Sequence, residues 1–383
     1  MTKLSIACVQ VNADTNMDRN VEIACDLVRQ AADAGADLIG LPENVALMAA
    51  SEEERLENAY RPADHPALKA FADVAREKGI WLQAGSVAAL RTDGSLANHA
   101  FLFDDQGRTV ADYEKIHMFD VDLPDGSRYR ESSMFNPGDQ AVLAATPWGG
   151  LGMTICYDLR FPHLYRDLAK AGADMLTCPA AFTKVTGDAH WEVLLRARAI
   201  ECGAFVFAPC QTGNHPGGRR TCGHSLIIDP WGVVLADGGT DVGFCIAEVD
   251  LAEVARVRGT IPALDHDRPY SPPVSQERQA AEWGSSLAAC ADALNGCRFG
   301  VIDNQVFVGQ HTQMACDGVE QFARAQQEIG IAGFSERFVA QGKRLIDQQA
   351  AWCDCADDRG KQGTVEIVAD NDRFKLPRAQ RPG

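Results

Sequence analysis

Residues 151–162 read LGMTICYDLRFP and decide how this chain is organised. The apolar run 151–155 is typical of a buried strand, and the residues after it lead into a helix. Cys156 therefore lies at a strand-to-helix junction, where the chain turns sharply at the carboxyl edge of a sheet. At such a turn, main-chain N–H groups and the helix N-terminus lower the pKa of a thiol and could receive an oxyanion. The alternative is a buried structural cysteine, which is the commoner occupant of a strand end.

The sequence on both sides of this junction alternates short apolar strands with helices. Strands are expected at 4–9, 37–41, 80–87, 151–156, 174–178, 204–209, 225–229 and 244–249, and helices at 18–34, 66–78, 163–171 and 189–202. In the helix at 18–34, for example, apolar residues recur at spacings of three and four. Alternation of this kind predicts an α/β layered fold, with helices covering the faces of the sheets.

The composition of the chain changes near residue 270. Residues 268–273 (RPYSPP) are poor helix and strand formers and predict a domain boundary. Beyond them the strand signal disappears, and amphipathic helices are expected at 275–294, 304–328 and 333–352. We therefore expect a first domain over 1–270 and an α-helical C-terminal extension of unknown role over 274–383. The extension could pack on the first domain, build an oligomer interface or bind a partner.

The overall charge narrows the class of partner. With 53 acidic and 36 basic residues, the chain carries a formal net charge of −17, which argues against a nucleic-acid partner. No apolar stretch approaches the roughly 20 residues that span a bilayer. Met1 leads almost directly into the strand at 4–9 and not into a secretory leader. Cys8, Cys178 and Cys245 lie inside apolar runs, as free thiols do, so we expect a cytoplasmic protein that binds no membrane.

Two other strand ends carry charged residues. Glu43 directly follows a proline at the end of the run LIGLPEN (38–44), and Lys115 stands in YEKIH (113–117). Taken alone, each is more often a solvated charge at a strand end. A thiol nucleophile usually needs a base, however, and no histidine is an obvious partner in the sequence.

Together the three strand ends resemble the nitrilase, or carbon–nitrogen hydrolase, superfamily, whose members carry a Glu–Lys–Cys triad in this chain order. The family's motifs match around Glu43, around Lys115 and at CYDLRFP (156–162), and the resemblance covers residues 3 to about 270. It implies a four-layer α-β-β-α sandwich over the first domain. It also implies a small amide substrate, no cofactor, and a homodimer or higher homo-oligomer.

The resemblance also implies a role for each catalytic residue. Cys156 would attack the amide carbonyl carbon, with the oxyanion stabilised by Lys115 and the backbone N–H of Tyr157. Glu43 would pass the thiol proton to the leaving ammonia and then activate water against the thioester. Glu131 aligns with a second glutamate that many members place near the triad, where it would orient Lys115 or the water. The alternative for Glu131 is a surface charge on a loop.

The segments 179–201, GHS (223–225) and DPWG (229–232) are similar to the Nit subgroup of this family. That subgroup includes deaminated-glutathione amidases and ω-amidases, which act on amides of 2-oxo acids. The likeness implies a thiol-dependent amidase that converts a terminal carboxamide of such a substrate to carboxylate and ammonia. The alternatives are an amidase for N-carbamoyl compounds or short aliphatic amides, and a scaffold whose helical extension binds a partner.

A substrate of this kind needs a cation for its carboxylate. Arg160 lies four residues after Cys156 and could supply a bidentate contact. Its alternative is a salt bridge to Asp158 or to a helix neighbour. Phe182 and Thr186 match family positions that line the same pocket.

Two local patterns could be mistaken for other sites. Cys210, His215, Cys222 and His224 lie close together, but their spacing fits no common zinc pattern, and we expect no metal. The glycine-rich stretch 213–220 does not open a helix after a strand, as a dinucleotide-binding motif would. We expect it to form a loop near the mouth of the pocket.

Overall fold

The computed structural model describes residues 3–272, 299–302 and 305–308. The chain divides into two units, Met1–Pro269 and Tyr270–Gly383. The catalytic candidates all belong to the first unit.

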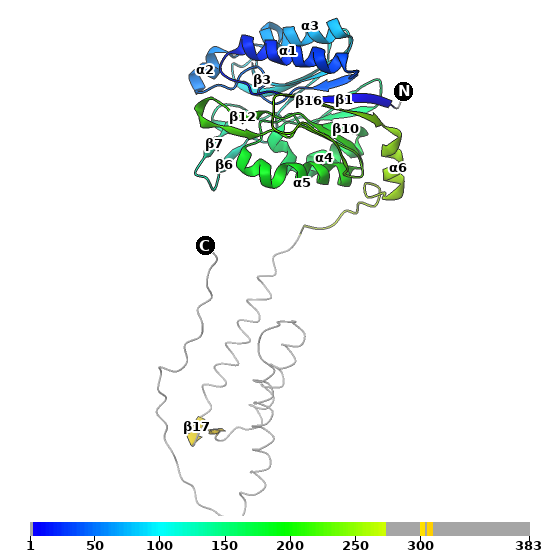
Figure 1. The fold of residues 1–383 in the computed structure, drawn as a ribbon. Helices are drawn as coiled ribbons and strands as arrows, with labels where there is room; N and C mark the ends of the chain where they lie inside the picture. The colour runs from blue at the N-terminus through cyan, green and yellow to red at the C-terminus, as the bar shows by residue number, and fades with distance from the viewer. Residues whose placement is uncertain (1–2, 273–298, 303–304, 309–383) are drawn as a thin grey trace, which may run out of the picture. The chain divides into compact units, whose positions relative to one another are not determined.

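The first sheet of this unit has the strand order β16-β1-β2-β3-β4-β5. Its strands are β1 (Lys3–Gln10), β2 (Leu38–Gly40), β3 (Trp81–Leu90), β4 (Leu96–Phe103), β5 (Thr109–Glu114) and β16 (Gly243–Asp250). β1, β2 and β3 run parallel, whereas β16 pairs with β1 antiparallel and closes the edge. Helices α1 (Met17–Asp33) and α3 (Pro66–Lys78) cover the outer face of this sheet (Figure 1).

The second sheet has the order β15-β14-β11-β10-β9-β8. Its strands are β8 (Val142–Ala145), β9 (Gly150–Met153), β10 (Ala173–Thr177), β11 (Phe205–Ala208), β14 (Leu226–Ile228) and β15 (Val234–Asp237). The central strands β9, β10 and β11 are parallel. Helices α4 (Pro162–Lys170) and α5 (Lys184–Cys202) cover the outer face of this sheet (Figure 1).

The two sheets pack face to face and bury one continuous apolar core. Leu38 and Leu102 of the first sheet share a buried cluster with Met153 and Phe207 of the second. A separate cluster fills the space between the first sheet and the helices α1 and α3. Burial of apolar surface on both faces of each sheet stabilises this arrangement. The predicted four-layer α-β-β-α sandwich is confirmed.

Local sequence signals explain where the covering helices begin and end. The side chain of Asn16 caps α1 by accepting a hydrogen bond from the backbone N–H of Arg19. Pro66 occupies the first position of α3, where a missing N–H costs nothing. Gly79 ends α3 with a φ of 63°, a left-handed conformation that glycine adopts readily.

Most of the predicted elements of the first unit have close counterparts, and α3 has the predicted bounds. Two ends differ. The strand expected at 151–156 ends at Met153, because the chain turns before Cys156. The helix expected at 189–202 begins at Lys184 instead, since Gly187 weakens the helical pattern there without ending the helix. Strands β4, β8 and β15 of the two sheets have no counterpart among the predictions, and neither do the strands of the two short hairpins given next.

Shorter elements complete the description. The first unit also contains α2 (Glu52–Glu57), α6 (Ala252–Thr260) and the hairpins formed by β6 (Asp120–Asp122) with β7 (Arg128–Arg130) and by β12 (Thr212–Asn214) with β13 (Arg220–Cys222). In the described part of the chain, no helix combines the length and apolar character needed to cross a membrane.

The second unit contains a hairpin where no strand was expected. β17 (Phe299–Ile302) pairs antiparallel with β18 (Gln305–Val308). The predicted helix at 304–328 is therefore wrong over Gln305–Val308. Apolar β-branched residues on both sides of a two-residue Asp-Asn connection favour a hairpin. The predicted helices at 275–294 and 333–352 lie outside the described residues, as does the rest of 304–328.

Candidate active site

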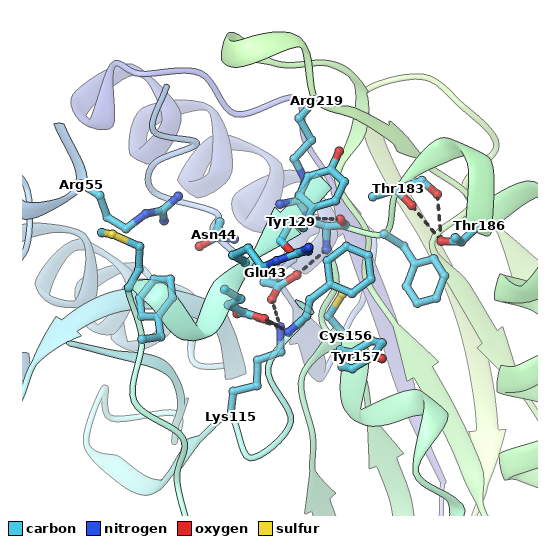
Figure 2. A pocket seen from close by; sticks show the side chains of 17 residues that line it. Glu43, Asn44, Arg55, Lys115, Tyr129, Cys156, Tyr157, Thr183, Thr186 and Arg219 are labelled. Atoms are coloured by element: carbon cyan, nitrogen blue, oxygen red, sulfur yellow. Dashed lines mark hydrogen bonds and ion pairs between the residues drawn. The ribbon is translucent and has the colours of Figure 1, made fainter. Parts of the chain in front are cut away.

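The three triad candidates all lie just beyond the carboxyl ends of strands. Glu43 follows β2, Lys115 is the residue directly after β5, and Cys156 opens a 3₁₀ turn (Cys156–Arg160) after β9. Because β2 and β5 belong to the first sheet and β9 to the second, the site forms only where the two sheets meet. All three residues line one cavity of about 160 Å³ (Figure 2).

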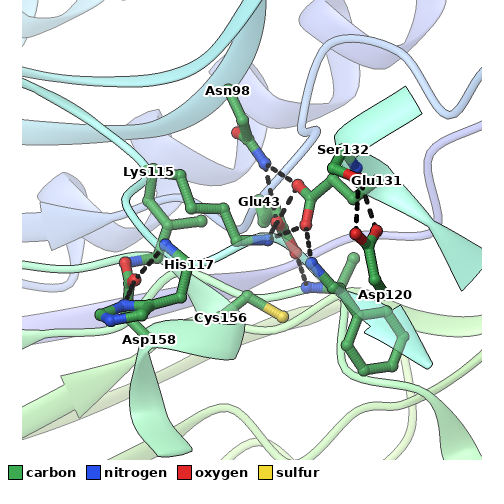
Figure 3. A network of polar contacts seen from close by, with 12 residues as sticks. Glu43, Asn98, Lys115, His117, Asp120, Glu131, Ser132, Cys156 and Asp158 are labelled. Carbon is green, nitrogen blue, oxygen red and sulfur yellow. Dashed lines mark hydrogen bonds and ion pairs between the residues drawn. The ribbon is translucent and has the colours of Figure 1, made fainter. Parts of the chain in front are cut away.

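Lys115 is held by two carboxylates. Its Nζ lies 2.8 Å from Oε1 of Glu43 and 2.8 Å from Oε2 of Glu131. The amide of Asn98 donates to both carboxylates, at 2.9 Å and 3.0 Å, and so fixes them relative to each other (Figure 3). Glu131 is thus a neighbour of Lys115 and not a surface charge, while its part in the reaction stays a prediction.

The second oxygen of Glu43 points to the other sheet. Oε2 accepts a hydrogen bond of 2.8 Å from the backbone N–H of Ala181, which follows β10. Gln211 donates its side-chain amide to the backbone carbonyl of Glu43 at 3.1 Å. Glu43 is 2% exposed, so both contacts are shielded from water. This carboxylate is therefore positioned by residues from both sheets.

Cys156 occupies a strained turn, as the strand-to-helix junction predicts. Its φ is 47°, which a residue with a side chain rarely adopts. The turn is held by a hydrogen bond of 3.0 Å from the Cys156 backbone N–H to the carbonyl of Pro179. Strain of this kind persists where the surroundings fix the chain, and it concentrates at functional sites.

Charges in the cavity set the protonation states of the triad. Burial by itself would raise the pKa of Glu43, but the charges of Lys115 and Arg219 outweigh it and lower the pKa to about 2. Burial opposes the charge of Lys115, yet Glu131 and Glu43 raise its pKa above the ordinary value. Burial raises the pKa of the Cys156 thiol, and the charge of Glu43 adds to the effect. The resting site therefore holds a thiol, a carboxylate and an ammonium group.

The expectation that the turn lowers the pKa of the thiol below its ordinary value is wrong. Cys156 is 6% exposed, and burial destabilises its thiolate by more free energy than the N–H groups of the turn supply. A carboxylate next to the sulfur opposes a second negative charge there.

A buried aspartate connects the lysine strand to the cysteine turn. Asp158 accepts hydrogen bonds from Tyr113 Oη at 2.8 Å and from the Ile155 backbone N–H at 2.9 Å. Its other oxygen lies 3.1 Å from the backbone N–H of His117 and 2.7 Å from Nδ1 of that residue (Figure 3). Residues on both sides of Lys115 are thus tied to the turn of Cys156. No such role was predicted for Asp158, although a charged residue inside an apolar motif is a usable signal.

Three of the four predicted substrate-binding residues line the cavity. Tyr157, Phe182 and Thr186 all contribute to its wall. The hydroxyl of Thr186 lies 2.8 Å from that of Thr183 (Figure 2). What these residues bind stays a prediction.

Arg160, the fourth, lies behind this wall. Its guanidinium carbon is 5.4 Å from the ring centroid of Phe182 and 5.9 Å from that of Tyr157. Its Nη2 lies 3.3 Å from Nδ1 of His190 on α5. In the described residues it forms no salt bridge to Asp158, whose oxygens have the four donors given above. Its role toward a substrate stays a prediction.

Three arginines that line the cavity, Arg55, Arg130 and Arg219, were missed. Arg55 comes from α2, and Arg219 comes from the connection between β12 and β13 (Figure 2). The glycine-rich stretch 213–220 was expected to form a loop near the pocket mouth. Its middle connects β12 and β13 and brings Arg219 to the cavity, whereas its two ends belong to these strands. Nothing in the sequence around Arg55 marks it, because α2 looks like an ordinary charged surface helix.

The candidate metal ligands have other partners. His215 bonds to the carbonyl of Ala13 and to Thr221, and His224 contacts Asp237. The sulfur atoms of Cys210 and Cys222 lie 3.9 Å apart. Within the described residues, no cluster of three His, Cys, Asp or Glu side chains is arranged to hold a metal ion.

Comparison with known proteins identifies the family of this site. Carbon–nitrogen hydrolases match residues 5–259. The chain belongs to the carbon–nitrogen hydrolase family. This membership confirms the expected enzyme class, a hydrolase of carbon–nitrogen bonds other than peptide bonds.

The relatives of this hydrolase include several with one name. "Deaminated glutathione amidase" of Yersinia enterocolitica is 38% identical over 288 residues, which cover 74% of this chain and all of that protein. The protein of that name from Synechocystis is 42% identical over 264 residues, covering 68% of this chain and 96% of the relative. The one from Mus musculus is 40% identical over 269 residues, with 69% and 83% covered.

Solved structures agree with the fold of the hydrolase. The Caenorhabditis elegans NitFhit protein superposes with a TM-score of 0.66 at 35% identity, covering 70% of this chain and 66% of that chain. Nit3 of Saccharomyces cerevisiae, a member of the nitrilase superfamily, gives a TM-score of 0.62 at 26% identity, with 68% and 95% covered.

Proposed function

We propose that this hydrolase is a thiol-dependent amidase of the deaminated-glutathione type, acting on amides of small 2-oxo acids. The observation that carries the proposal is the buried Cys156–Glu43–Lys115 constellation in a chain about 40% identical to relatives of that name. We also propose that catalysis proceeds through a thioester on Cys156.

In the first half-reaction, the sulfur of Cys156 bonds to the amide carbonyl carbon while its proton moves to Glu43. Because the thiol pKa is raised and that of Glu43 is lowered, the proton transfer is unfavourable in the free enzyme. The transfer therefore accompanies attack, and the negative charge develops on the carbonyl oxygen. Lys115 and the backbone N–H of Tyr157 stabilise that oxyanion. Glu43 then protonates the leaving nitrogen, the C–N bond breaks and the thioester remains.

In the second half-reaction, Glu43 takes a proton from a water molecule as its oxygen adds to the thioester carbonyl. The tetrahedral intermediate collapses, the C–S bond breaks and the proton returns to Cys156. The free carboxylic acid leaves. Glu131 takes no proton in this scheme; its bonds to Lys115 keep the ammonium group aimed at the oxyanion.

The acyl half of the substrate fits the wall formed by Phe182 and Thr186. We assign its 2-oxo-acid carboxylate to Arg160, whose guanidinium lies behind Phe182 and Tyr157. Contact would require the Arg160 side chain to move from His190 toward the cavity. A bidentate contact of this kind cannot be reproduced by lysine, because only the guanidinium presents two parallel donors.

We also propose a homodimer, supported by apolar side chains that face solvent. Ile200 on α5, Trp231 and Ile261 are 54%, 50% and 57% exposed and line one shallow pocket. Exposed apolar patches of this kind are typical of protein–protein interfaces. Light scattering that gives a monomer mass at micromolar concentration would contradict this proposal.

A cytoplasmic location is a further proposal, supported by cysteine chemistry. The eight cysteines described in the structure are all free and buried. Free thiols persist in a reducing compartment. Fractionation of native cells, with detection of the chain by antibody, tests this location.

A panel of amides tests the proposed function. The full-length enzyme would be given a 2-oxo-acid amide, an N-carbamoyl amino acid and a short aliphatic amide, with Cys156→Ala as the control. We expect the highest kcat/KM for the 2-oxo-acid amide and no turnover by the variant. A preference for the N-carbamoyl compound would assign the enzyme to another branch of the family. No turnover of any amide would favour the scaffold alternative.

A further inference from the structure

Two carboxylates surround Lys115, but the proposed reaction gives a proton to only one of them. The lysine Nζ lies 2.8 Å from Glu43 and 2.8 Å from Glu131, so the ammonium group does not distinguish the two. They differ in the other hydrogen-bond donors that face their oxygens. These donors decide where a proton can be accepted.

Glu131 has no acceptor position left. A carboxylate accepts about four hydrogen bonds, two on each oxygen. Oε1 of Glu131 accepts from Lys115 at 2.9 Å and from the side-chain amide of Asn98 at 3.0 Å. Oε2 accepts from Lys115 at 2.8 Å and from the backbone N–H of Phe119 at 2.7 Å. A proton can reach this carboxylate only after one of the donors has left it.

Glu43 keeps one acceptor position open, on the oxygen that faces the second sheet. Its Oε1 accepts from Lys115 at 2.8 Å and from Asn98 at 2.9 Å. In the described residues, its Oε2 accepts one hydrogen bond, from the backbone N–H of Ala181 at 2.8 Å. Ala181 follows β10, and Cys156 follows the neighbouring parallel strand β9. The open position is therefore on the side of the nucleophile.

Asn98 fills the last position on Oε1 of both glutamates (Figure 3). This residue lies on β4, is 1% exposed and does not line the cavity. Its backbone carbonyl accepts a hydrogen bond of 2.9 Å from the backbone N–H of Lys115. One residue thus holds the backbone of the lysine and both of its counter-ions.

The orientation of the Asn98 amide destabilises the fold locally. Its Oδ1 is buried and has no hydrogen-bond partner in the described residues. An apolar side chain of similar size would avoid this unsatisfied acceptor. The reverse orientation of the amide would place Oδ1 against two carboxylate oxygens, which would repel it. Packing alone therefore does not explain an asparagine here, whereas the two N–H groups that it directs at the glutamates do.

We propose that Asn98 is a positioning residue that makes Oε2 of Glu43 the proton acceptor of the reaction. This inference rests on the proposed function and deepens it. The electron pair of the S–H bond of Cys156 forms the S–C bond, and the proton moves to Oε2. It then passes from Oε2 to the leaving nitrogen as the C–N bond breaks. Asn98 acts by occupying Oε1 of both glutamates, so that the proton has one place to go.

The experiment compares two variants of Asn98 with the wild type, all as full-length enzyme. Asn98→Ala removes both N–H donors together with the unsatisfied carbonyl group. Asn98→Asp keeps the shape but donates no hydrogen bond until it binds a proton. Gln10→Glu is the matched control, because Gln10 is a fully buried amide that donates to the backbone carbonyls of Gly239 and Asp241 and not to a carboxylate.

The first readout separates kcat from KM for the side-chain amide of 2-oxoglutarate. We expect kcat to fall by roughly 10- to 100-fold in Asn98→Ala, because Glu43 is displaced and a proton can rest on Oε1. KM should be nearly unchanged, because Asn98 does not line the cavity. Gln10→Glu should keep the kcat of the wild type.

The second readout is the pH dependence of kcat, which a purely structural role would not change. The ionisable groups around Asn98 and the adjoining cavity are Glu43, Glu131, Lys115, Cys156 and Arg219. In Asn98→Asp, three carboxyl groups lie together, and their repulsion favours the binding of one proton. Once protonated, the introduced carboxyl group again donates a hydrogen bond toward Oε1. The kcat of Asn98→Asp should therefore lie below that of Asn98→Ala at about pH 8 and above it at about pH 5.5.

The third readout is the rate at which iodoacetamide alkylates Cys156. This rate depends on removal of the thiol proton but not on the choice of amide. It should fall in Asn98→Ala and stay at the wild-type value in Gln10→Glu. Asn98→Ala introduces no buried charge, so it carries the test by itself if Asn98→Asp does not fold.

The possible failures differ from one another. Wild-type kcat and alkylation rate in folded Asn98→Ala would overturn the positioning role while leaving the proposed function in place. A ratio of the two variants' kcat values that stays constant with pH would do the same. Wild-type enzyme that hydrolyses no amide would overturn the proposed function, and the alkylation rates would then decide the role of Asn98 without it.

Discussion

The two sheets contribute to the active site in different ways. The first sheet supplies Glu43 and Lys115, charged groups whose positions are fixed by ion pairs of 2.8 Å and whose charges are maintained by their neighbours. The second sheet supplies Cys156, a neutral thiol on a strained turn that a hydrogen bond to the carbonyl of Pro179 holds in place. One sheet thus provides the charged groups of the site, and the other provides the nucleophile.

This difference makes catalysis depend on the packing of the sheets. Neither sheet alone holds both a nucleophile and a base. Two sets of hydrogen bonds connect the sheets: the backbone N–H of Ala181 donates to Glu43, and the Tyr113 hydroxyl and the His117 backbone N–H donate to Asp158. A misplacement of about 1 Å between reacting groups can lower a rate by about 100-fold. We therefore expect the largest losses of kcat when the nucleophile or the base is removed. Weakening the hydrogen bonds between the sheets should cause smaller losses.

Removing the nucleophile should have the largest effect. Cys156→Ala should lower kcat by about 10⁴-fold or more, because no other group can form the thioester. Cys156→Ser should also be nearly inactive, since Glu43 is too weak a base to activate an alcohol. Iodoacetamide labelling with peptide mapping, alongside assays of both variants, tests this. Full activity of protein alkylated at Cys156 would contradict the mechanism.

Removing the base that the first sheet supplies should have the second largest effect on kcat. Glu43→Gln keeps the shape of the side chain but cannot accept the thiol proton, so kcat should fall by about 10² to 10⁴-fold. Steady-state kinetics of the full-length variant measures this. An increase in KM with kcat unchanged would make Glu43 a substrate-binding residue instead.

Much of the fold was accessible from sequence because its signals are local. The apolar strands of both sheets are short uninterrupted runs, and α3 is bounded by Pro66 and Gly79, whose backbone preferences do not depend on the rest of the chain. The residues after β2, β5 and β9 could be grouped by their likeness to a family motif. The geometry then placed all three in one cavity.

What the sequence did not reveal depends on long-range packing. Arg55 and Arg219 meet at the cavity although α2 and the β12–β13 connection are far apart in the chain. The raised pKa of Cys156 depends on burial by both sheets, which local sequence cannot report. The missed strand β4 is buried on both faces and lacks the alternation that marks a half-buried strand.

Loosening the connection between the sheets should have an intermediate effect. Asp158→Asn loses one acceptor and turns a donor toward Tyr113 or His117, which leaves a buried donor unsatisfied. We expect kcat to fall by about tenfold, because Lys115 and Cys156 are no longer held at a fixed position relative to each other. KM should be nearly unchanged, because the substrate pocket is intact. Kinetics and the rate of Cys156 alkylation measure this.

The alkylation rate separates positioning from general damage. If Asp158 acts only through stability, folded Asp158→Asn should match the wild type in both kcat and alkylation rate once its lower Tm is allowed for. That result would remove Asp158 from the account of the site.

The smallest effect concerns stability at the outer face of the first sheet and should leave activity unchanged. His65 precedes α3 and is 2% exposed, and its Nδ1 has no hydrogen-bond partner in the described residues. Burial lowers the pKa of His65 from 6.5 to about 4. Between these values the unfolded chain binds the proton and the folded chain does not, so stability falls as pH decreases from 6.5 toward 4. The shift corresponds to about 3 kcal/mol over that window.

His65→Gln should therefore flatten the pH dependence of stability, whatever it does to stability at pH 7. Urea unfolding of the wild type and the variant at pH values from 4.5 to 7 measures the difference between their two slopes. His266→Gln is the matched control, because His266 is exposed and its removal should leave the slope as it is in the wild type. The active site lies at the junction of the sheets and not beside α3, so kcat/KM at pH 7 should be the same in all three proteins. Equal slopes for the wild type and His65→Gln would show that His65 has the same pKa in the folded and unfolded chains, which would contradict this prediction.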